Sequence, residues 1–424
     1  MTAIRLTPTA PSSHGNLSQH VAAVASKRLS HVEVDKTKSH QHEFNGDSGL
    51  ILLFGRADTA QRFPARFLYL SDDPLESVAD DGFLTWYDAR VAGRARGIDR
   101  TEHRLYFTSN SVSRMSKPGD RLFIARMHDQ QVIAVVTKKG STAEAQLVWL
   151  FGLDADGRPR FEVRVEEDLR PTQTSFAVRA ILALIGIDTV DDASEWLDHM
   201  IEKFGKKFPN THDFSEFARN TLATVDWLAD PDRALVDWMA REEALFRAFE
   251  RHLFAAQLQA LPSGGAVDPD TVIPLVKSIL NRRMSRAGLA LENHLAHGFP
   301  LSGILFSLKP VTEGTLKPDF IFPGINEYRD PLFPWERLTM LAAKRTCKDR
   351  WRQILNEALR IPSKHLLTLE PGISMNQTNE MRNEGVHLVI PTQLQATFKL
   401  EQRRDMLSLQ GFIGHVRECQ ARNA

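Results

Sequence analysis

Hydrophobic and polar positions along the chain change their spacing twice. From residue 50 to about 165, short runs of β-branched and aromatic residues alternate with turn-forming clusters, a pattern typical of strands. From residue 176 to about 295 the apolar residues recur at helical spacing, and beyond residue 296 strand-like runs resume between helices. The pattern therefore predicts a β segment, a helical segment and an α/β segment, in chain order.

The first segment holds the longest series of strand-like runs. We expect strands at 50–54, 66–70, 83–87, 103–108, 121–127, 131–137, 146–151 and 160–165. Their spacing favours a small β-barrel or sandwich over residues 1–165, in which residues 1–16 form a flexible tail rich in threonine, proline and serine. Residues 166–175 are polar, contain a proline and precede the change of period, so we expect the linker there.

Residues 176–424 are expected to form a second domain. Its first part, 176–295, is mainly helical. Its second part, 296–424, has strand-like runs at 303–309, 318–322, 338–344, 364–369 and 386–390, with helices at 348–359 and 375–383 between them. Strands flanked by helices predict an α/β core with a mixed sheet.

Composition narrows the class of protein. Lysine plus arginine and aspartate plus glutamate number 53 each, so any contact with nucleic acid must come from local basic patches. The two cysteines, Cys347 and Cys419, are too few for a disulfide framework, and we expect a reducing, cytoplasmic location. The longest apolar run, 176–187, is too short to cross a bilayer, so we expect no membrane association.

Three residues could supply the chemistry of metal-dependent phosphodiester cleavage. That reaction needs a divalent cation to activate water, and usually a lysine near the attacked phosphate. A hairpin would place Asp319 on one strand beside Lys344 on the next, and Mg²⁺ prefers hard oxygen ligands of this kind. Ala342 stands two residues before the lysine, where simple nucleases carry an acid.

Glu357 is the predicted replacement for that missing acid. It lies 13 residues after Lys344 in the expected helix, where an inward side chain could reach the same Mg²⁺. The alternative is that Asp319 merely follows a proline at a turn and that Glu357 is a surface acid.

Several segments of the second domain closely resemble the catalytic domain of EcoRII-type restriction endonucleases. The resemblance spans about residues 208–413 and is carried by 281–288, 317–320, 344–358, 364–366 and 385–389. It implies a restriction-endonuclease-like α/β/α core of the PD-(D/E)XK class, whose acid has migrated to the following helix. It also implies catalytic roles for Asp319, Lys344 and Glu357, with Glu292 and Tyr328 as supporting members. Tyr328 could instead be a packing residue near a proline-rich turn.

The same resemblance implies how DNA is read. Lys348, Asp349 and Arg350 would contact the C:G pairs of a CC…GG core, since arginine and lysine bind guanine and aspartate accepts from cytosine. Alternatively, Asp349 simply favours the N-terminus of a solvated helix. The family holds flipped central bases with an arginine and an aromatic residue, but the matching positions are Met239 and Glu243. Nearby Trp238 and Arg241 could substitute, so the central base stays open.

The first domain contains two basic segments, around residues 27–42 and 88–104. It resembles, more loosely, the DNA-binding pseudobarrel of plant B-three transcription factors and of EcoRII-like effector domains. That resemblance implies one DNA-contacting arm with Lys27 and His40, and another with the residues Arg90, Arg100, Glu102 and Arg104. The alternative is that these are solvated turns. No Cys/His spacing around His31 or His42 supports zinc.

Together these features predict a type II restriction endonuclease that makes Mg²⁺-dependent double-strand cuts. A symmetric site implies a homodimer. The resemblance implies control by a second DNA copy bound to the N-terminal domain (type IIE), and a cognate DNA methyltransferase in the same system. Alternatives are a sequence-specific DNA-binding regulator with a silent nuclease core, or a repair or methylation-dependent nuclease.

Overall fold

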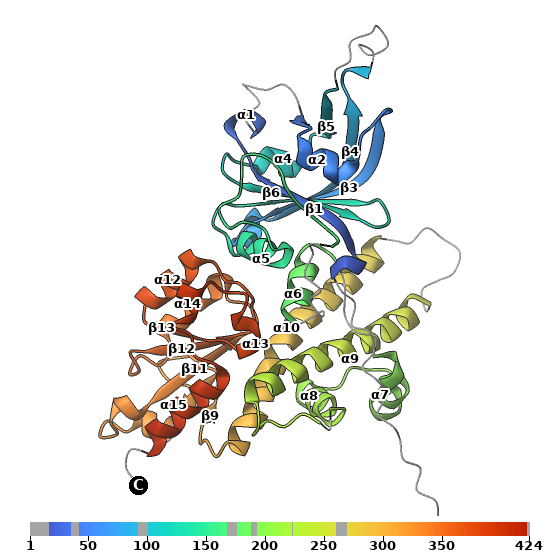
Figure 1. The fold of residues 1–424 in the computed structure, drawn as a ribbon. Coiled ribbons are helices and arrows are strands. Elements are labelled where there is room, and N and C mark those ends of the chain that lie inside the picture. Colours follow the sequence, from blue (N-terminus) through green and yellow to red (C-terminus); the bar gives the residue numbers. More distant parts are fainter. Residues whose placement is uncertain are drawn as a thin grey trace, which may run out of the picture. The chain divides into compact units, whose positions relative to one another are not determined.

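The chain divides into two compact units, Met1–Thr189 and Val190–Ala424 (Figure 1). The computed structural model describes residues 17–34, 42–91, 101–167, 176–187, 193–222, 224–259 and 269–421. The division falls later than the expected linker at 166–175. The cause is helix α6 (Phe176–Leu184), which belongs to the first unit because Val178, Ile181 and Leu182 pack into its core.

The described part of the first unit is built on an eight-stranded sheet with the order β2-β5-β4-β3-β7-β6-β1-β8. Neighbouring strands are antiparallel except for the parallel pair β3 and β7. The strands are β1 (Val21–Arg28), β2 (Glu43–Asn45), β3 (Gln61–Leu70), β4 (Val78–Asp88), β5 (His103–Phe107), β6 (Arg121–Met127), β7 (Val132–Thr137) and β8 (Glu162–Val165). Short helices join them: η1 (Leu17–Gln19), α1 (His31–Val34), α2 (Ser48–Phe54), η2 (Pro74–Glu76), α4 (Ser111–Met115) and α5 (Thr142–Phe151).

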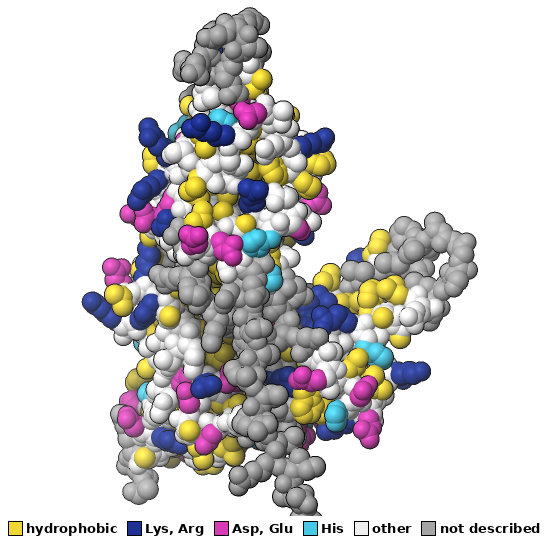
Figure 2. Space-filling model, turned by 45° about the vertical axis from the view of Figure 1, so that its right-hand side comes forward, with side chains coloured by type: hydrophobic (Ala, Val, Ile, Leu, Met, Phe, Trp, Pro, Cys, Tyr) yellow, Lys and Arg dark blue, Asp and Glu magenta, His cyan; other side chains and the backbone are white. Residues whose placement is uncertain are grey.

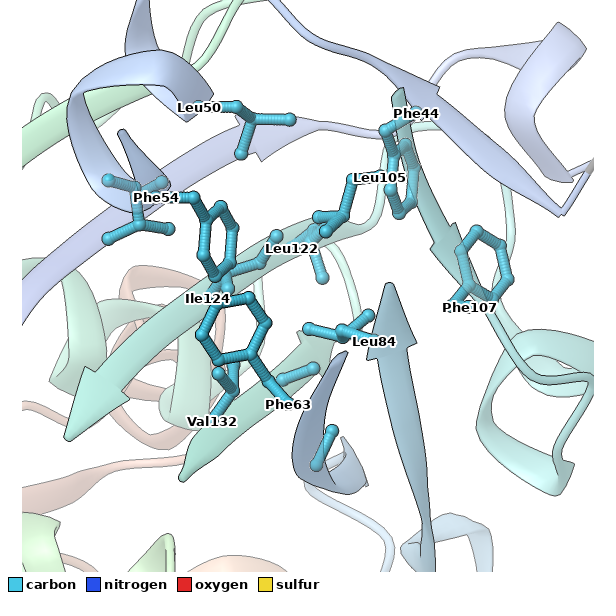
Figure 3. Close-up of a cluster of buried hydrophobic side chains, with 14 of the residues drawn as sticks. Phe44, Leu50, Phe54, Phe63, Leu84, Leu105, Phe107, Leu122, Ile124 and Val132 are labelled. Carbon is cyan, nitrogen blue, oxygen red and sulfur yellow. The ribbon is translucent and has the colours of Figure 1, made fainter. Parts of the chain in front are cut away.

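Apolar side chains pack on both faces of this sheet. One cluster, shown in Figure 3, includes Phe44, Phe63, Leu105 and Ile124. Successive strand residues point to opposite faces, so Phe123 joins a different cluster, together with α5 and α6. Two-sided burial explains why β7 reads as a nearly continuous apolar run.

Two predicted strands, 50–54 and 146–151, are helices instead, namely α2 and α5. Short apolar runs fit either structure, and here the helix caps decide. The Asp47 side chain accepts from the N–H groups of Gly49 and Leu50, at 3.0 and 3.1 Å. In α5 the Ser141 hydroxyl accepts from the backbone N–H of Glu144, and Gly152 ends the helix in the left-handed region.

The second unit begins with the expected helical part. Its described helices are η3 (Ser194–Trp196), α7 (Leu197–Phe204), α8 (Thr211–Asn220), α9 (Pro231–Gln259) and α10 (Pro269–Leu301), of which α9 and α10 are the longest (Figure 1). The carboxylate of Asp232, in the first turn of α9, accepts from the N–H groups of Thr392, Leu409 and Gln410 at 2.9–3.0 Å. This buried carboxylate ties the helical part to the C-terminal α/β part of the same unit.

A five-stranded mixed sheet follows, with the order β13-β12-β11-β10-β9 among the described residues. β11 (Thr339–Lys344), β12 (Lys364–Thr368) and β13 (Val386–Val389) are parallel, whereas β9 (Ser307–Leu308) and β10 (Phe320–Phe322) pair antiparallel. The predicted mixed sheet is confirmed. Helices around it are α11 (Ile325–Arg329), η4 (Trp335–Arg337), η5 (Lys348–Asn356), α12 (Met375–Asn383), α13 (Thr392–Gln395), α14 (Leu400–Arg403) and α15 (Leu409–Ala421).

In the described ranges, no helix is both long enough and apolar enough to cross a bilayer. Basic and acidic side chains are interspersed over the face drawn in Figure 2, in keeping with a net charge of zero.

Candidate active site

Asp319 and Lys344 meet across the antiparallel pair β10 and β11. The register Phe320↔Leu341 places Asp319 opposite Ala342, and Lys344 projects from the same face two residues further along. The Lys344 ammonium lies 2.8 Å from Asp319 Oδ2, which also accepts the Ala343 N–H at 2.8 Å. The sheet register therefore fixes both side chains before any ligand arrives.

Glu357 stands near this pair, but the predicted helix over 348–359 is wrong in two respects. The helix η5 is a 3₁₀-helix that ends at Asn356, and Glu357 follows it in extended conformation with φ −82° and ψ 144°. Ala358 then turns the chain with a positive φ of 48°. Glu357 is thus presented by a loop directly after a helix, not by a helical face.

The charges of Asp319 and Lys344 both act on the Glu357 carboxylate. Its pKa is raised to about 7, mainly by burial and in part by the charge of Asp319, while the charges of Lys344 and Lys364 oppose the rise. Oε2 is buried and accepts no hydrogen bond from the residues that the structure describes. A buried carboxylate oxygen without a donor, beside a second carboxylate and a lysine, is the arrangement that a cation would complete.

Glu292 borders the same site from α10. Its carboxylate lies 2.5 Å from the ammonium of Lys309. The backbone N–H of Lys309 donates to the backbone carbonyl oxygen of Asp319 at 2.9 Å. Burial raises the pKa of Glu292, and the charge of Asp319 adds to this rise while Lys309 opposes it. Glu292 therefore neighbours Asp319, and Lys309 largely balances the charge of Glu292. Lys309 was not singled out from the sequence.

Tyr328 faces a different set of partners. Its hydroxyl donates to Glu313 and accepts the backbone N–H of Arg360 at 3.3 Å. Burial, followed by the bond to Glu313, raises the pKa of Tyr328 to about 12. These hydrogen bonds join the Tyr328 hydroxyl to Glu313 and to the loop that carries Glu357, and not to Asp319 or Lys344.

The negative charge of Asp319 and Glu357, and the carboxylate oxygen of Glu357 that has no donor among the described residues, fit a divalent cation. No group of three or more His, Cys, Asp and Glu side chains forms a metal cluster within the described ranges. Asp319, Glu357 and water would be the donors for an ion here. Mg²⁺ suits such a donor set, because it keeps several waters and binds few carboxylates.

The predicted DNA-reading residues lie at the start of η5. Lys348, Asp349 and Arg350 form the start of η5, and their side chains lie outside the described residues. Met239 and Glu243 line a pocket beside Arg345, and the Glu243 carboxylate pairs with Arg345 at 2.7 Å.

Neither nearby substitute for the missing base platform is well placed. Trp238 is 5% exposed and stacks on Trp227 with ring centroids 5.4 Å apart, so it is a core residue. The Arg241 guanidinium donates to Thr221 at 2.9 Å and lies over the ring of Trp196. Both side chains are held within the helical part of the unit.

The first unit gathers part of one predicted arm. Glu102 accepts from Arg90 at 2.8 Å and also from Arg104, which extends toward Glu43 at 3.9 Å. Arg100 and His40 lie outside the described residues.

Lys27 differs from the expected exposed arm. It is 8% exposed, pairs with Glu33 and lies over the ring of Phe161. As it stands, this ammonium is engaged within the fold.

Comparisons with known proteins give a consistent relationship. The family profile described as EcoRII C terminal matches residues 246–413. The type II restriction enzyme EcoRII of Escherichia coli is 31% identical over 395 residues, covering 92% of this chain and 93% of that protein.

Among solved structures, metal-depleted Ecl18kI in complex with uncleaved, modified DNA has a TM-score of 0.44 at 18% identity, covering 55% of this chain and 87% of that one. The complex of restriction endonuclease PspGI with substrate DNA has a TM-score of 0.41 at 16% identity, covering 51% and 95%. The sequence relationship to EcoRII, extending over nearly the full length of both chains, shows that this chain belongs to the EcoRII family of type II restriction enzymes and is a type II site-specific nuclease.

Proposed function

We propose that this nuclease makes Mg²⁺-dependent double-strand cuts at a short DNA site with a CC…GG core. The observation that carries the proposal is the convergence of Asp319, Lys344 and Glu357, with a buried Glu357 oxygen that accepts no hydrogen bond from the described residues. When bound, Mg²⁺ lowers the pKa of a coordinated water and neutralises charge on phosphorus.

Each of the candidate site residues has a defined part in this proposal. Asp319 and Glu357 would hold the ion, each with one carboxylate. Lys344, fixed by its bond to Asp319, would place its ammonium against the phosphate oxygens that gain negative charge during attack. Glu292, paired with Lys309, would adjust the charge around Asp319 without a ligand role of its own.

Site selection is assigned to the start of η5. Lys348, Asp349 and Arg350, at the start of η5, directly follow the strand that carries Lys344, so base reading and cleavage would be joined by one short segment. Arginine and lysine suit guanine edges, and aspartate suits cytosine.

The first unit is proposed as an effector domain with a DNA-binding pseudobarrel. Arg90, Glu102 and Arg104 would form one arm together with Arg100, and Lys27 and His40 the other. A phosphate contact by Lys27 requires that it first leave Glu33. Binding of a second DNA copy there would release the nuclease, as in type IIE enzymes.

The proposed assembly is a cytoplasmic homodimer paired through the second unit, because a symmetric duplex site needs two cutting centres. A DNA methyltransferase of the same specificity would protect the host sequence.

Mapping the ends released from a plasmid of known sequence tests the proposal. With Mg²⁺ we expect all ends to fall at sites sharing a CC…GG core, and with a chelator no ends. Ends unrelated to such sites, or cutting only after methylation of the substrate, would contradict the assigned specificity. Equal rates on one-site and two-site plasmids would remove the effector role alone.

A further inference from the structure

The backbone that carries Glu357 is held from one side by a buried lysine. Lys364, the first residue of β12, is 4% exposed. Its ammonium donates to the carbonyl oxygens of Glu357 and Ala358, at 2.5 and 2.7 Å. Because β12 is an inner strand of the sheet, this bond ties the loop to a rigid element.

A second hold comes from Glu313, in the segment between β9 and β10. Its Oε1 accepts both the Tyr328 hydroxyl and the backbone N–H of Leu359, the latter at 3.2 Å. Tyr328 in turn accepts the N–H of Arg360 at 3.3 Å. Four consecutive residues, 357–360, are therefore each bonded through their backbone to Lys364, Glu313 or Tyr328.

The local conformation explains why such a hold is needed. The chain leaves η5, becomes extended at Glu357 and passes through a positive φ at Ala358. A side chain with a Cβ rarely adopts that region, and it persists only where the surroundings impose it. Without the bonds to its carbonyl groups, the loop would relax and carry the Glu357 carboxylate away from Asp319.

The charges around the loop are also matched. Burial lowers the pKa of Lys364 to about 8, although Glu313 and Glu357 both oppose the shift. Burial works against the charged form of Glu313, but hydrogen bonds from Tyr328 and Thr312 hold its pKa below the usual value. One buried cation thus interacts with the charges of both Glu357 and Glu313.

We propose that Glu313 and Lys364 are positioning residues of the nuclease. They fix the backbone of residues 357–360 and thereby set how tightly Asp319 and Glu357 bind their divalent ion. Tyr328 then acts through Glu313, not on the substrate. The inference rests on the proposed function, because it assumes that Glu357 is a ligand.

Lys364→Met tests the proposal by removing the ammonium while keeping most of the apolar stem. Binding of Mn²⁺ to the DNA-free protein is measured by electron paramagnetic resonance, and the Mg²⁺ dependence of plasmid cleavage is measured beside it. We expect weaker ion binding by about tenfold or more, with a smaller change of kcat at saturating Mg²⁺. Lys364→Arg, which keeps a cation, should recover part of the affinity.

Arg337→Met is the matched control. Arg337 also donates to two backbone carbonyl groups, those of Cys419 and Gln420 at 3.3 and 3.2 Å, but these lie in α15. It should lose stability without changing ion affinity. Wild-type ion affinity in a folded Lys364→Met protein would overturn the role of Lys364.

Tyr328→Phe and Glu313→Leu extend the test, and they decide it if Lys364→Met does not fold. Each should weaken Mn²⁺ binding. Unchanged ion affinity in both would overturn the role of Glu313, and a loss of kcat alone in Tyr328→Phe would place Tyr328 in the chemical step. Cutting at the wild-type rate by Glu357→Gln would instead defeat the proposed function, so the two failures are distinguishable.

Discussion

Asp319 and Glu357 approach the same lysine but are held in opposite ways. Asp319 is placed by the register of two strands, and its Oδ2 accepts both the Lys344 ammonium and a backbone N–H. Glu357 sits on a loop braced by side chains, and its buried Oε2 accepts no hydrogen bond from the described residues. The comparison teaches that the strand pair is satisfied without a ligand, whereas a buried loop carboxylate without a donor is destabilising.

The largest expected effect is on cleavage by Lys344→Ala. Removing a preorganised cation that faces the reacting phosphate should lower kcat by about 10²–10³-fold or more, while specific DNA binding is retained. Plasmid cleavage and gel-shift titration measure the two quantities. Lys207→Ala, an exposed lysine of the same unit, should cut normally. Retained cutting by Lys344→Ala would mean that the lysine is misassigned.

Asp319→Asn and Glu357→Gln should have different effects on the stability of the protein. Both should abolish cleavage. Without metal at pH 8, Asp319→Asn should lower Tm by about 2–6 °C, because a partly buried lysine loses its partner at a cost of about 1–2 kcal/mol. Glu357→Gln should leave Tm unchanged or raise it, because it removes a buried charge. Equal losses of Tm in both variants would contradict the contrast between the two sites.

Ionisation of Glu357 should make both Tm and ion binding depend on pH, with an effect of intermediate size. Its pKa is raised to about 7 in the folded protein, so its contribution to stability is full below about pH 4.5 and is lost as the pH rises through 7. The advantage of Glu357→Gln in Tm should therefore grow between these values. Ion binding has the opposite trend, since only the ionised carboxylate is a ligand.

Mn²⁺ affinity should accordingly rise up to about tenfold per pH unit below pH 7 and level off above it. Titrations between pH 5.5 and 8.5 measure this. An affinity independent of pH in that range would exclude Glu357 from the ligands.

The smallest effect is expected from Lys309→Met. Lys309 is half-exposed and its side chain touches Glu292, while its bond to Asp319 uses only the backbone. Cleavage at saturating Mg²⁺ should fall by less than about fivefold, the value of an ordinary ion pair with an exposed partner. A loss as large as that of Lys344→Ala would make Lys309 part of the catalytic group.

The fold was predictable where the pattern and the local signals agreed. The parallel strands β11, β12 and β13 were expected from buried apolar runs, and α12 from its helical period. Strand β1 was missed because Val21–Arg28 is rich in alanine, a poor strand former. Helices α2 and α5 were mistaken for strands, although Asp47 and Ser141 before them are recognisable N-caps.

The pairing of Asp319 with Lys344 was predictable, but the support of Glu357 was not. A hairpin spacing links Asp319 with Lys344, and the spacing after Lys344 predicted Glu357, but the loop that presents Glu357 looked helical. Glu313 and Lys364 carry no motif of their own. Their roles arise from contacts made in the fold. Glu313 accepts from Leu359, 46 residues away, and Lys364 donates to Glu357, 7 residues away.

Shared binding of one ion by Asp319 and Glu357 is best tested by Mn²⁺ titration of the wild type, Asp319→Asn, Glu357→Gln and the double variant. If both carboxylates hold the same ion, each single change should weaken binding strongly, and the double change should add much less than the sum of the two. Wild-type Mn²⁺ affinity in either single variant would contradict the account.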